Sequence, residues 1–327
     1  MKSDVSVIIP NFNGEKYIAN CLESILDQSF YEFGQMEIIV VDDCSSDDSV
    51  NIIKGYKEVK LEVNPVNSGF DKSVNQGIKA SSGTYCLLLN NDVVVDRDFV
   101  KYLYRHIDEN PDVFSVSSKM VRYYERNKLD DTGDFYNIFG WAYKRGDGKP
   151  VEAYKKRTSV FSTCAGAGIY RRSVLDEIGL FDETFFAYLE DVDISYRGMI
   201  YGYQNHYEPQ AICYHIGSAT TADGQKYSPF KVKISARNNI YVVYKNMPML
   251  QLLINSPFLL LGFLIKYLLF WKRGYGKDYS AGIKEGLKNC RQMKKVPVQS
   301  KNLGHYILIE IQLIHNLFRH VISKLVR

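Results

Sequence analysis

Three clusters of polar residues, each following a short apolar run, carry side chains suited to binding sugars, nucleotides or metal ions. They read PNFNGE from Pro10, DDCSSDD from Asp42 and NND from Asn90. A free carboxylate at the end of an apolar run, such as Asp42 or Asp43, is costly unless it accepts hydrogen bonds. A nucleobase edge or ribose hydroxyls would supply donors. Asp92 could be an oxygen ligand to Mg²⁺ or Mn²⁺, which would bridge a pyrophosphate and offset charge on a leaving group.

Ordinary turn chemistry is the competing interpretation of each cluster. Asn, Asp, Ser and Gly are turn residues, and NND could be an Asx turn that closes a strand. Ser45 or Ser46 could cap a helix whose first turn holds Asp47 and Asp48. Helix capping explains Asp47 and Asp48 well, but it explains Asp42 and Asp43 poorly. Because three clusters occur together, we favour a site over three turns, and we expect NND to deliver Asp92 rather than to form a turn.

The elements that must position these clusters alternate along the first half of the chain. Runs typical of strands start at Val5, Met36, Lys60, Thr84 and Val113, and segments with helical periodicity follow the first four. This alternation predicts an α/β fold with a mostly parallel sheet covered on both faces. In such sheets, ligand groups collect at the carboxyl ends of the strands, where all three clusters lie.

Composition and missing motifs exclude several classes of protein. The chain has 327 residues, 46% of them hydrophobic, and a formal net charge of +4, which is too weak to indicate nucleic acid as the main partner. No Gly-rich dinucleotide or P-loop motif occurs, so a dehydrogenase or P-loop enzyme lacks its phosphate cradle. The six cysteines lie far apart, which predicts reduced thiols rather than a zinc site or disulfides. The N-terminus lacks a signal-peptide core, so we expect the cytoplasm.

Four stretches together resemble the family 2 glycosyltransferases of the GT-A fold, in particular the bacterial rhamnosyltransferase-like members of polysaccharide assembly. They are SVIIPNFNGEKYIANCLESIL, EIIVVDDCSSDDS, NSGFDKSVNQGIKASSGTYCLLLNNDVVVD and FDETFFAYLEDVDISYR, within the span from Val5 to Asn246. The resemblance implies an enzyme that moves a sugar, usually with inversion, from a nucleoside diphosphate donor to an acceptor hydroxyl. The alternative is a catalytically inactive sugar-nucleotide-binding or scaffold protein of the same fold. A sugar-phosphate nucleotidyltransferase would need a basic, Gly-rich loop that NFNGEKY supplies poorly.

The resemblance also assigns residues to the donor site. The implied nucleotide- and donor-binding positions are Pro10, Asn11, Asn13, Glu15, Asp42, Ser45, Asp47, Asn67, Gly69, Asn75, Asn90 and Asn91. NND falls where the family has its D-x-D metal motif, but Asn90 replaces the first Asp. Asp92 is therefore the expected ligand to Mg²⁺ or Mn²⁺, and His215 is a second ligand or a phosphate contact.

The second half supplies the predicted catalytic residues. Glu190, Asp191 and Asp193 lie within four residues at the start of a helical run. Inverting transfer needs a base opposite the leaving group, and in the family the Asp of the ED pair fills that role. This maps to Asp191, with Glu190 as its supporter. We interpret Asp193 as a first-turn helix acid paired with Arg197 at i, i+4. The stretch 122–158 is expected to be a variable acceptor-side region.

The composition changes at residue 247, which divides the chain into a predicted catalytic domain, 1–246, and a membrane-associating region, 247–327. Residues 247–265 carry no charge, but Asn255, Pro257 and the following Lys266 favour in-plane or re-entrant helices as much as a membrane span. The tail from Leu303 has the pattern of a basic amphipathic helix, which is typical of a membrane interface. We expect a peripheral or monotopic enzyme on the cytoplasmic membrane face, acting on a lipid-linked saccharide. Packing on the catalytic domain or formation of a homodimer is the alternative.

Overall fold

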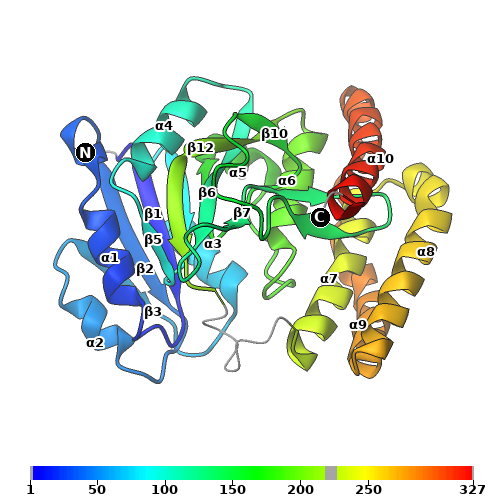
Figure 1. Cartoon of the computed structure of the whole chain (residues 1–327), viewed down its shortest axis with the longest axis horizontal. Helices are drawn as coiled ribbons and strands as arrows, with labels where there is room; N and C mark the ends of the chain where they lie inside the picture. The colour runs from blue at the N-terminus through cyan, green and yellow to red at the C-terminus, as the bar shows by residue number, and fades with distance from the viewer. Residues whose placement is uncertain (1–2, 218–226, 326–327) are drawn as a thin grey trace.

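The computed structural model describes residues 3–217 and 227–325 and contains a central mixed sheet flanked by helices (Figure 1). Within these residues, the sheet has ten strands, eight of which follow the order β10-β12-β6-β11-β4-β1-β2-β3. The other two, β5 and β7, pair with β12 and β6, and β8 pairs with β9 in a separate small sheet. The strands are β1 (Val5–Asn11), β2 (Met36–Asp42), β3 (Val59–Val63), β4 (Tyr85–Leu89), β5 (Val93–Val95), β6 (Val113–Arg122), β7 (Leu129–Asp131), β8 (Asp134–Tyr136), β9 (Ala142–Lys144), β10 (Thr158–Val160), β11 (Ala167–Arg171) and β12 (Gln204–His215).

The first half has the predicted α/β alternation. The helices there are α1 (Ile18–Leu26), α2 (Ser49–Lys54), α3 (Phe70–Ala80) and α4 (Phe99–Asp108), with the 3₁₀ turn η1 (Ser29–Glu32). Strands β1, β2, β3 and β4 are mutually parallel where they pair. Alternate residues of β1 face opposite layers: Val7 packs in the cluster of α1 and α4, and Ile8 packs with α3. All loops after these strands therefore meet at one edge.

The sheet departs from a simple parallel series after β4. The strand-like run at Val113 was expected to extend the alternating series, but β11 lies between β4 and β6 and is antiparallel to both. Strand β6 then pairs in parallel with β12, whose far end also pairs with β5. This insertion brings the loop before β11 and the end of β12 next to the loop after β4. Two distant segments of the chain thereby reach the edge where the first clusters lie.

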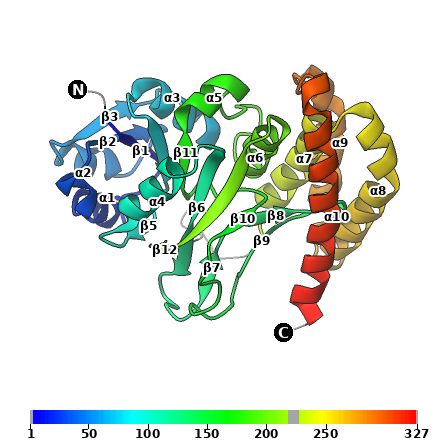
Figure 2. The ribbon, with the colours of Figure 1, turned by 90° about the horizontal axis from the view of Figure 1, so that it is seen from above.

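The C-terminal helices form a layer at one end of the molecule (Figure 2). The helices of the second half are α5 (Arg172–Ile178), α6 (Glu190–Ile200), α7 (Pro229–Asn246), α8 (Met249–Lys272), α9 (Gly276–Asn289) and α10 (Leu303–Leu325), with the 3₁₀ turns η2 (Cys290–Gln292) and η3 (Ser300–Asn302). The predicted boundary at 246/247 falls between α7 and α8. One hydrophobic cluster nevertheless contains Tyr196 of α6, Leu259 of α8 and Leu313 of α10. The two predicted domains thus share a core.

The cysteines are all free, as the sequence predicts. Four of them are buried, Cys164 is half-buried and Cys44 is exposed.

Candidate active site

The ends of β1 and β2 are joined by hydrogen bonds between their polar side chains. Asn11 donates through Nδ2 to Asp42 Oδ1 at 2.7 Å, and Asn91 Nδ2 donates to Asn11 Oδ1 at 2.7 Å. The backbone N–H of Ser45 donates to Asp42 Oδ2 at 3.0 Å. A Cβ on Gly14 would lie 2.3 Å from both Asn11 Oδ1 and Asn91 Nδ2, so only glycine leaves room for their bond. The donors that the buried Asp42 carboxylate requires therefore come from the protein, which corrects the argument that a ligand must supply them. Its contact with a nucleotide stays a prediction.

The loops after β1 and β2 are also tied to each other. The backbone N–H of Ser46 donates to Asn13 Oδ1 at 2.9 Å, and the N–H of Glu15 donates to Asp47 Oδ2 at 2.9 Å. Glu15 Oε2 in turn accepts from the N–H of Asp48 at 3.1 Å. Asn13 and Glu15 are exposed and Asp47 is half-buried. Sequence reasoning placed these residues in one site, and the structure brings them together as one braced rim. Pro10, at the end of β1, is half-buried beside it.

Asp43 organises the segment before α3. Its Oδ2 accepts from the N–H of Gly69 at 2.8 Å, a donor that Asn67 Oδ1 shares at 3.2 Å. Gly69 has a φ of 90°, and a Cβ there would lie 2.7 Å from the carbonyl oxygen of Phe186. The glycine is needed both for the left-handed backbone and for the close approach of the 186 segment. Asn67 is exposed at the rim and open to a ligand.

Asn75 is used by the protein itself. Its Nδ2 donates to the carbonyl of Phe181 at 2.8 Å, and its Oδ1 accepts from the N–H of Phe181 at 3.0 Å. Nδ2 also donates to Glu183 Oε1 at 3.1 Å. The side chain is buried and braces α3 against the segment before α6. The structure therefore gives Asn75 a bracing role, and its direct contact with a donor stays a prediction.

NND forms a tight turn between β4 and β5. The N–H of Val93 donates to the carbonyl of Asn90 at 3.2 Å, and the N–H of Asn90 donates to the carbonyl of Gly166 at 2.8 Å. We expected NND to deliver Asp92 instead of forming a turn. The opposition between the two is wrong, because NND forms a turn and this turn places Asp92. Asp92 is only 6% exposed, whereas Asn90 and Asn91 are half-buried.

A chain of charged side chains runs from Asp92 into the region left unassigned at the sequence level. Asp92 Oδ2 lies 3.4 Å from His215 Nε2, and His215 Nδ1 lies 2.8 Å from Asp130 Oδ2. Lys144 Nζ reaches the same Asp130 oxygen at 2.8 Å. Burial opposes the charged imidazole, but its bonds to Asp130 and Asp92 outweigh that effect and raise the pKa of His215 to about 9. His215 thus has a partner, Asp130, that the sequence reasoning did not predict.

This arrangement fits the divalent ion that the family resemblance implies. Asp92 offers a buried carboxylate, and His215 would offer Nε2 once the ion displaces the proton that lies between Nε2 and Asp92. Metal-binding histidines commonly hydrogen-bond a carboxylate through their other nitrogen, as His215 does with Asp130. Asn90 is bonded through its backbone to the turn and to Gly166, and its side chain adds a neutral carbonyl at most.

The first turn of α6 holds the predicted base. Asp191 Oδ1 accepts from the N–H of Val192 at 2.7 Å, and the side chain is half-buried. Burial raises the pKa of Asp191 to about 6, against the opposing effect of N–H groups of Val192 and Ala165. A carboxylate with this pKa is ionised at neutral pH and still basic enough to take a proton.

Glu190 has a different environment from its neighbour. It is buried, and its Oε2 has no hydrogen-bond partner among the described residues. Both carboxylate oxygens of Asp71, in the first turn of α3, are likewise buried and unpartnered there. Burial, and then the charges of Asp71 and Asp191, raise the pKa of Glu190 well above its usual range. Burial, and then the charges of Asp182, Asp193 and Asp191, do the same for Asp71. The supporting role of Glu190 stays a prediction.

The interpretation of Asp193 and Arg197 as a structural pair is confirmed. Arg197 Nε lies 3.0 Å from Asp193 Oδ2, four residues away on α6. Lys245 Nζ and Asn246 Nδ2 of α7 also donate to Asp193, at 2.9 Å and 2.7 Å. Although Asp193 is buried, the charges of Lys245 and Arg197 hold its pKa below the usual range. This network fixes α6, and with it Asp191, against α7.

Three residues that sequence reasoning missed lie within electrostatic range of Asp191. They are Asp131, Asp134 and Cys164, from β7, β8 and the loop before β11. Burial raises the pKa of Asp131 to about 7 and that of Asp134 well above its usual range. The close spacing of acidic residues in LDDTGD is the sequence feature that could have indicated Asp131 and Asp134.

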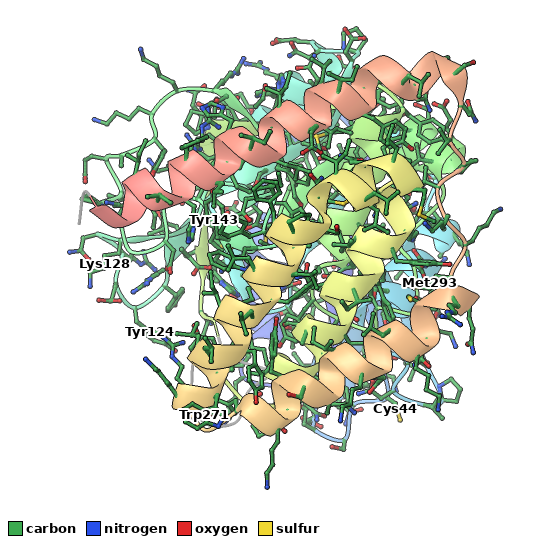
Figure 3. All side chains as sticks on the ribbon, turned by 90° about the vertical axis from the view of Figure 1, so that its right-hand side faces the viewer. Cys44, Tyr124, Lys128, Tyr143, Trp271 and Met293 are labelled. Atoms are coloured by element: carbon green, nitrogen blue, oxygen red, sulfur yellow. The ribbon has the colours of Figure 1, made fainter. Side chains whose placement is uncertain are left out.

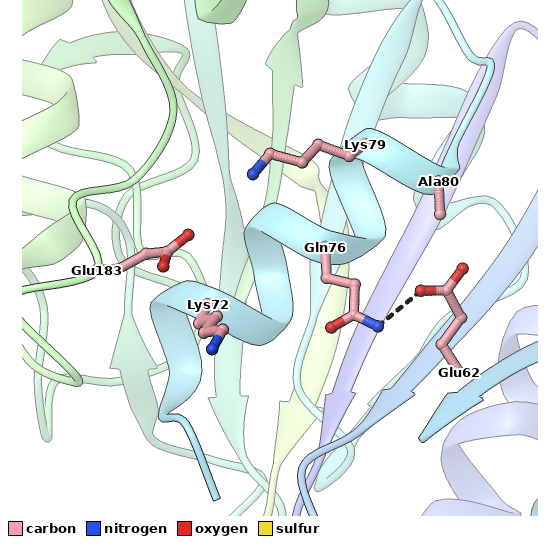
Figure 4. Close-up of a pocket in the computed structure, with 6 residues that line it drawn as sticks. All are labelled: Glu62, Lys72, Gln76, Lys79, Ala80 and Glu183. Carbon is pink, nitrogen blue, oxygen red and sulfur yellow. Dashed lines mark hydrogen bonds between the residues drawn. The ribbon is translucent and has the colours of Figure 1, made fainter. Parts of the chain in front are cut away.

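Two surface pockets lie apart from these residues. One, of about 440 Å³, lies along α3 and is lined by Glu62, Lys72, Gln76, Lys79, Ala80 and Glu183 (Figure 4). There the amide of Gln76 points to Glu62 and donates to it at 2.8 Å. The other, of about 500 Å³, lies beside α1 and β5. Neither pocket is lined by a predicted catalytic, donor-binding or metal-binding residue, although Tyr123 of the expected acceptor-side region 122–158 lines the second.

The strand-end rim and the NND turn lie within a stretch of the chain that matches a known protein family. The model of Glycosyl transferase family 2 matches residues 6–179, more than half of the chain. The chain belongs to glycosyl transferase family 2. The predicted family and the predicted class of enzyme, a glycosyltransferase, are thereby confirmed.

Relatives and solved structures agree with this assignment. The chain is 27% identical over 224 residues to poly-beta-1,6-N-acetyl-D-glucosamine synthase of Staphylococcus epidermidis, covering 65% of this chain and 50% of the relative. It thus spans half the length of that relative. Among solved structures, S. aureus TarS 1-349 in complex with UDP-GlcNAc matches with a TM-score of 0.53 and 19% identity, covering 91% of this chain and 94% of that one. Mannosyltransferase PcManGT from Pyrobaculum calidifontis, in complex with GDP-Man and Mn²⁺, matches with a TM-score of 0.56 and 14% identity, covering 90% and 89%. These likenesses confirm the predicted GT-A fold.

Proposed function

We propose that this family 2 glycosyltransferase moves a sugar, with inversion, from a nucleoside diphosphate donor to an acceptor hydroxyl during assembly of a cell-surface polysaccharide. The observation that carries the proposal is Asp191, a carboxylate in the first turn of α6 with a pKa of about 6. The braced rim formed by the loops after β1 and β2 is the proposed nucleotide site. Solved proteins with the same fold were crystallised with UDP-GlcNAc or GDP-Man, which supports a sugar-nucleotide donor.

The reaction needs one base and one departing diphosphate. The ionised Asp191 takes the proton of the acceptor hydroxyl as its oxygen attacks the anomeric carbon of the donor sugar. The bond from that carbon to the diphosphate breaks on the opposite face, and its electron pair leaves with the phosphate oxygen. The raised pKa of Glu190 and of Asp71 favours their protonated forms and so limits the negative charge next to the base. The Asp193 network holds α6 in place during the transfer.

Asp92 and His215 are the residues we propose to hold Mg²⁺ or Mn²⁺. When bound, such an ion offsets the negative charge on the diphosphate as it leaves. Asp130 orients the His215 ring through Nδ1, which leaves Nε2 directed to the side of Asp92. Mn²⁺ accompanies the nucleotide sugar in the solved mannosyltransferase complex, which supports a divalent ion here.

Release of nucleoside diphosphate tests the proposed chemistry. The purified chain is incubated with UDP-, GDP- and dTDP-sugars, and the released diphosphate is measured for the native chain and for Asp191→Asn. Loss of a general base should lower turnover by about 10²- to 10⁴-fold. Asp176→Asn, which removes an exposed carboxylate on α5, is the matched control and should keep full turnover. Equal release by Asp191→Asn would refute the base assignment, and no turnover of any donor would favour the inactive, scaffold alternative.

We also propose that α8 and α10 attach the enzyme to the cytoplasmic membrane surface, in the plane of the interface, where it meets a lipid-linked acceptor. Among the described residues, α8 is the one helix long and apolar enough to cross a membrane. Leu261 and Leu264 of α8 are exposed, and so are Ile307 and Phe318 of α10. Figure 3 shows that the two helices lie on the same end of the molecule. Exposed apolar patches of this kind mark membrane or protein contacts.

The inner face of α8 argues for lying on the membrane rather than crossing it. Asn255 is fully buried and donates to Glu310 of α10 at 2.8 Å, and Gln251 donates to the same carboxylate at 2.7 Å. A Cβ on Gly262 would lie 2.2 Å from the carbonyl oxygen of Phe139, so the helix packs directly on the catalytic domain. Crossing a bilayer would require α8 to leave this surface and expose those polar groups to lipid.

Cosedimentation with vesicles tests the attachment. The full chain should sediment with anionic lipid vesicles, and the double variant Leu261→Glu, Leu264→Glu should stay in the supernatant. Val63→Glu changes an equally exposed apolar residue on β3 and is the matched control. If the double variant sediments like the native chain, the surface is not the attachment site. A stable homodimer in light scattering that the double variant abolishes would assign the surface to subunit contact instead.

A further inference from the structure

A second group of metal-binding side chains lies beside the proposed catalytic base. Asp131, Asp134 and Cys164 each offer one ligand atom, and these atoms all lie within 4.8 Å of one another. They come from β7, β8 and the loop before β11, so the group exists only in the folded chain. Both aspartates are buried, and Cys164 is half-buried.

One oxygen of this group lacks an N–H or hydroxyl donor. Asp131 Oδ1 accepts from the N–H of Gly133 at 2.6 Å, but Oδ2 is buried without such a donor among the described residues. Asp131 is only 1% exposed, and its carboxyl can bond that of Asp134 only when one of the two carries a proton. A cation would replace that proton and satisfy both buried carboxylates.

The surrounding backbone holds the ligands in place. The N–H of Asp134 donates to the carbonyl of Ser162 at 2.8 Å, which joins β8 to the strand leading to Cys164. The carbonyl of Cys164 accepts from the N–H of Ala167 at 3.3 Å, so the cysteine sits in a closed turn. Ligands supported in this way need little rearrangement to close on an ion.

We propose that Asp131, Asp134 and Cys164 form a binding site for Zn²⁺ that is separate from the Asp92 and His215 pair. One thiolate with two carboxylates suits zinc, whereas Mg²⁺ avoids sulfur ligands. Zinc bonds of about 2.0–2.3 Å to these atoms would bring the ligands roughly 3.4–3.8 Å apart, a small contraction from the spacing present. The fourth position of the tetrahedron stays open, as in zinc sites that bind water or substrate.

The two sites are distinct because neighbouring residues of β7 serve them. Asp130 bonds His215 and Lys144, whereas Asp131 belongs to the cluster with Asp134. A positive charge in the second site would lie within electrostatic range of Asp191. It would weaken that carboxylate as a proton acceptor, so we expect added zinc to slow transfer without displacing the donor.

Direct measurement of zinc binding tests the proposal and needs no sugar donor. The full chain, kept reduced with a phosphine, is titrated with Zn²⁺ in calorimetry, and with Co²⁺ to detect the absorption of a cobalt thiolate. We expect one ion per chain and a thiolate band. Cys164→Ser should abolish the band. It should also weaken zinc binding more than the loss of a residue that only supports a metal ligand, which lowers affinity roughly 10- to 100-fold.

Three further variants make the result decisive. Cys44→Ser removes the exposed cysteine and should leave binding unchanged. Asp92→Asn should also keep the zinc site while removing the proposed Mg²⁺ or Mn²⁺ ligand. Asp134→Asn should weaken zinc, with folding checked by circular dichroism. The proposal is overturned if no zinc binds, if Cys164→Ser keeps the affinity and the cobalt band, or if Cys44→Ser removes them. None of these outcomes depends on whether sugar transfer itself is observed.

Discussion

The acid limb of the pH profile should report the ionisation of Asp191. Its pKa of about 6 makes it about 90% ionised at pH 7 and about 10% ionised at pH 5. Because the base must be unprotonated to accept the acceptor's proton, activity is lost as the pH falls, and kcat/KM should drop about tenfold between these two values. An aspartate with an ordinary pKa near 3.9 would stay over about 90% ionised at pH 5 and would give almost no drop. The size of the drop therefore separates a buried base from an exposed one.

The assay is the initial rate of nucleoside diphosphate release at subsaturating donor, from pH 4.5 to 8, with saturating Mg²⁺ or Mn²⁺. Asp176→Asn should reproduce the limb, and circular dichroism at pH 5 should show that the chain stays folded. A flat profile between pH 5 and 7, or a midpoint near 4, would refute the reasoning, because it would mean that burial does not govern the protonation of the base.

Three other changes have defined outcomes. Gly14→Ala places a methyl group in the contact between Asn11 and Asn91, so it should lower the free energy of unfolding by about 1–3 kcal/mol and raise the KM for donor. Urea unfolding measures the first effect and donor titration the second. Unchanged values would count against the rim as the nucleotide site. Asn255→Ala removes a buried donor from the half-buried Glu310 carboxylate and should cost about 1–3 kcal/mol in the same unfolding assay, with Asn255→Asp costing more because it adds a like charge. Equal stability would show that this contact does not hold the two helices together. Treatment with EDTA should reduce diphosphate release and added Mn²⁺ or Mg²⁺ should restore it, whereas full activity in EDTA would contradict the metal assignment after β4.

The first half of the fold was predictable because its periodicity is local. Apolar residues of α1 recur at Ile18, Cys21, Leu22 and Ile25, and all four are buried. The position of β11 was not predictable in this way. Its pairing with both β4 and β6 depends on which strand edges meet in space, and periodicity does not encode strand order.

The candidate site shows the same division between local and distant information. The bond between Asp193 and Arg197 followed from their spacing on one helix. The roles of Asp130 and Lys144 did not, because they lie on strands of three residues that show no pattern, and their partner His215 is distant in sequence. The hydrogen bond from Asn11 to Asp42 was not predicted for a related reason, since Asn11 comes from a neighbouring strand.

The cluster that joins α6 to the C-terminal helices limits how such an enzyme can be rebuilt. Val192 and Tyr196, on the helix of the proposed base, pack in the same cluster as Ile309 and Leu313 of α10. A gene fusion or truncation that exchanged residues 247–327 for another segment would strip apolar cover from that helix. The two parts of the chain should therefore change together in evolution and in engineering, as one heritable unit rather than as exchangeable modules.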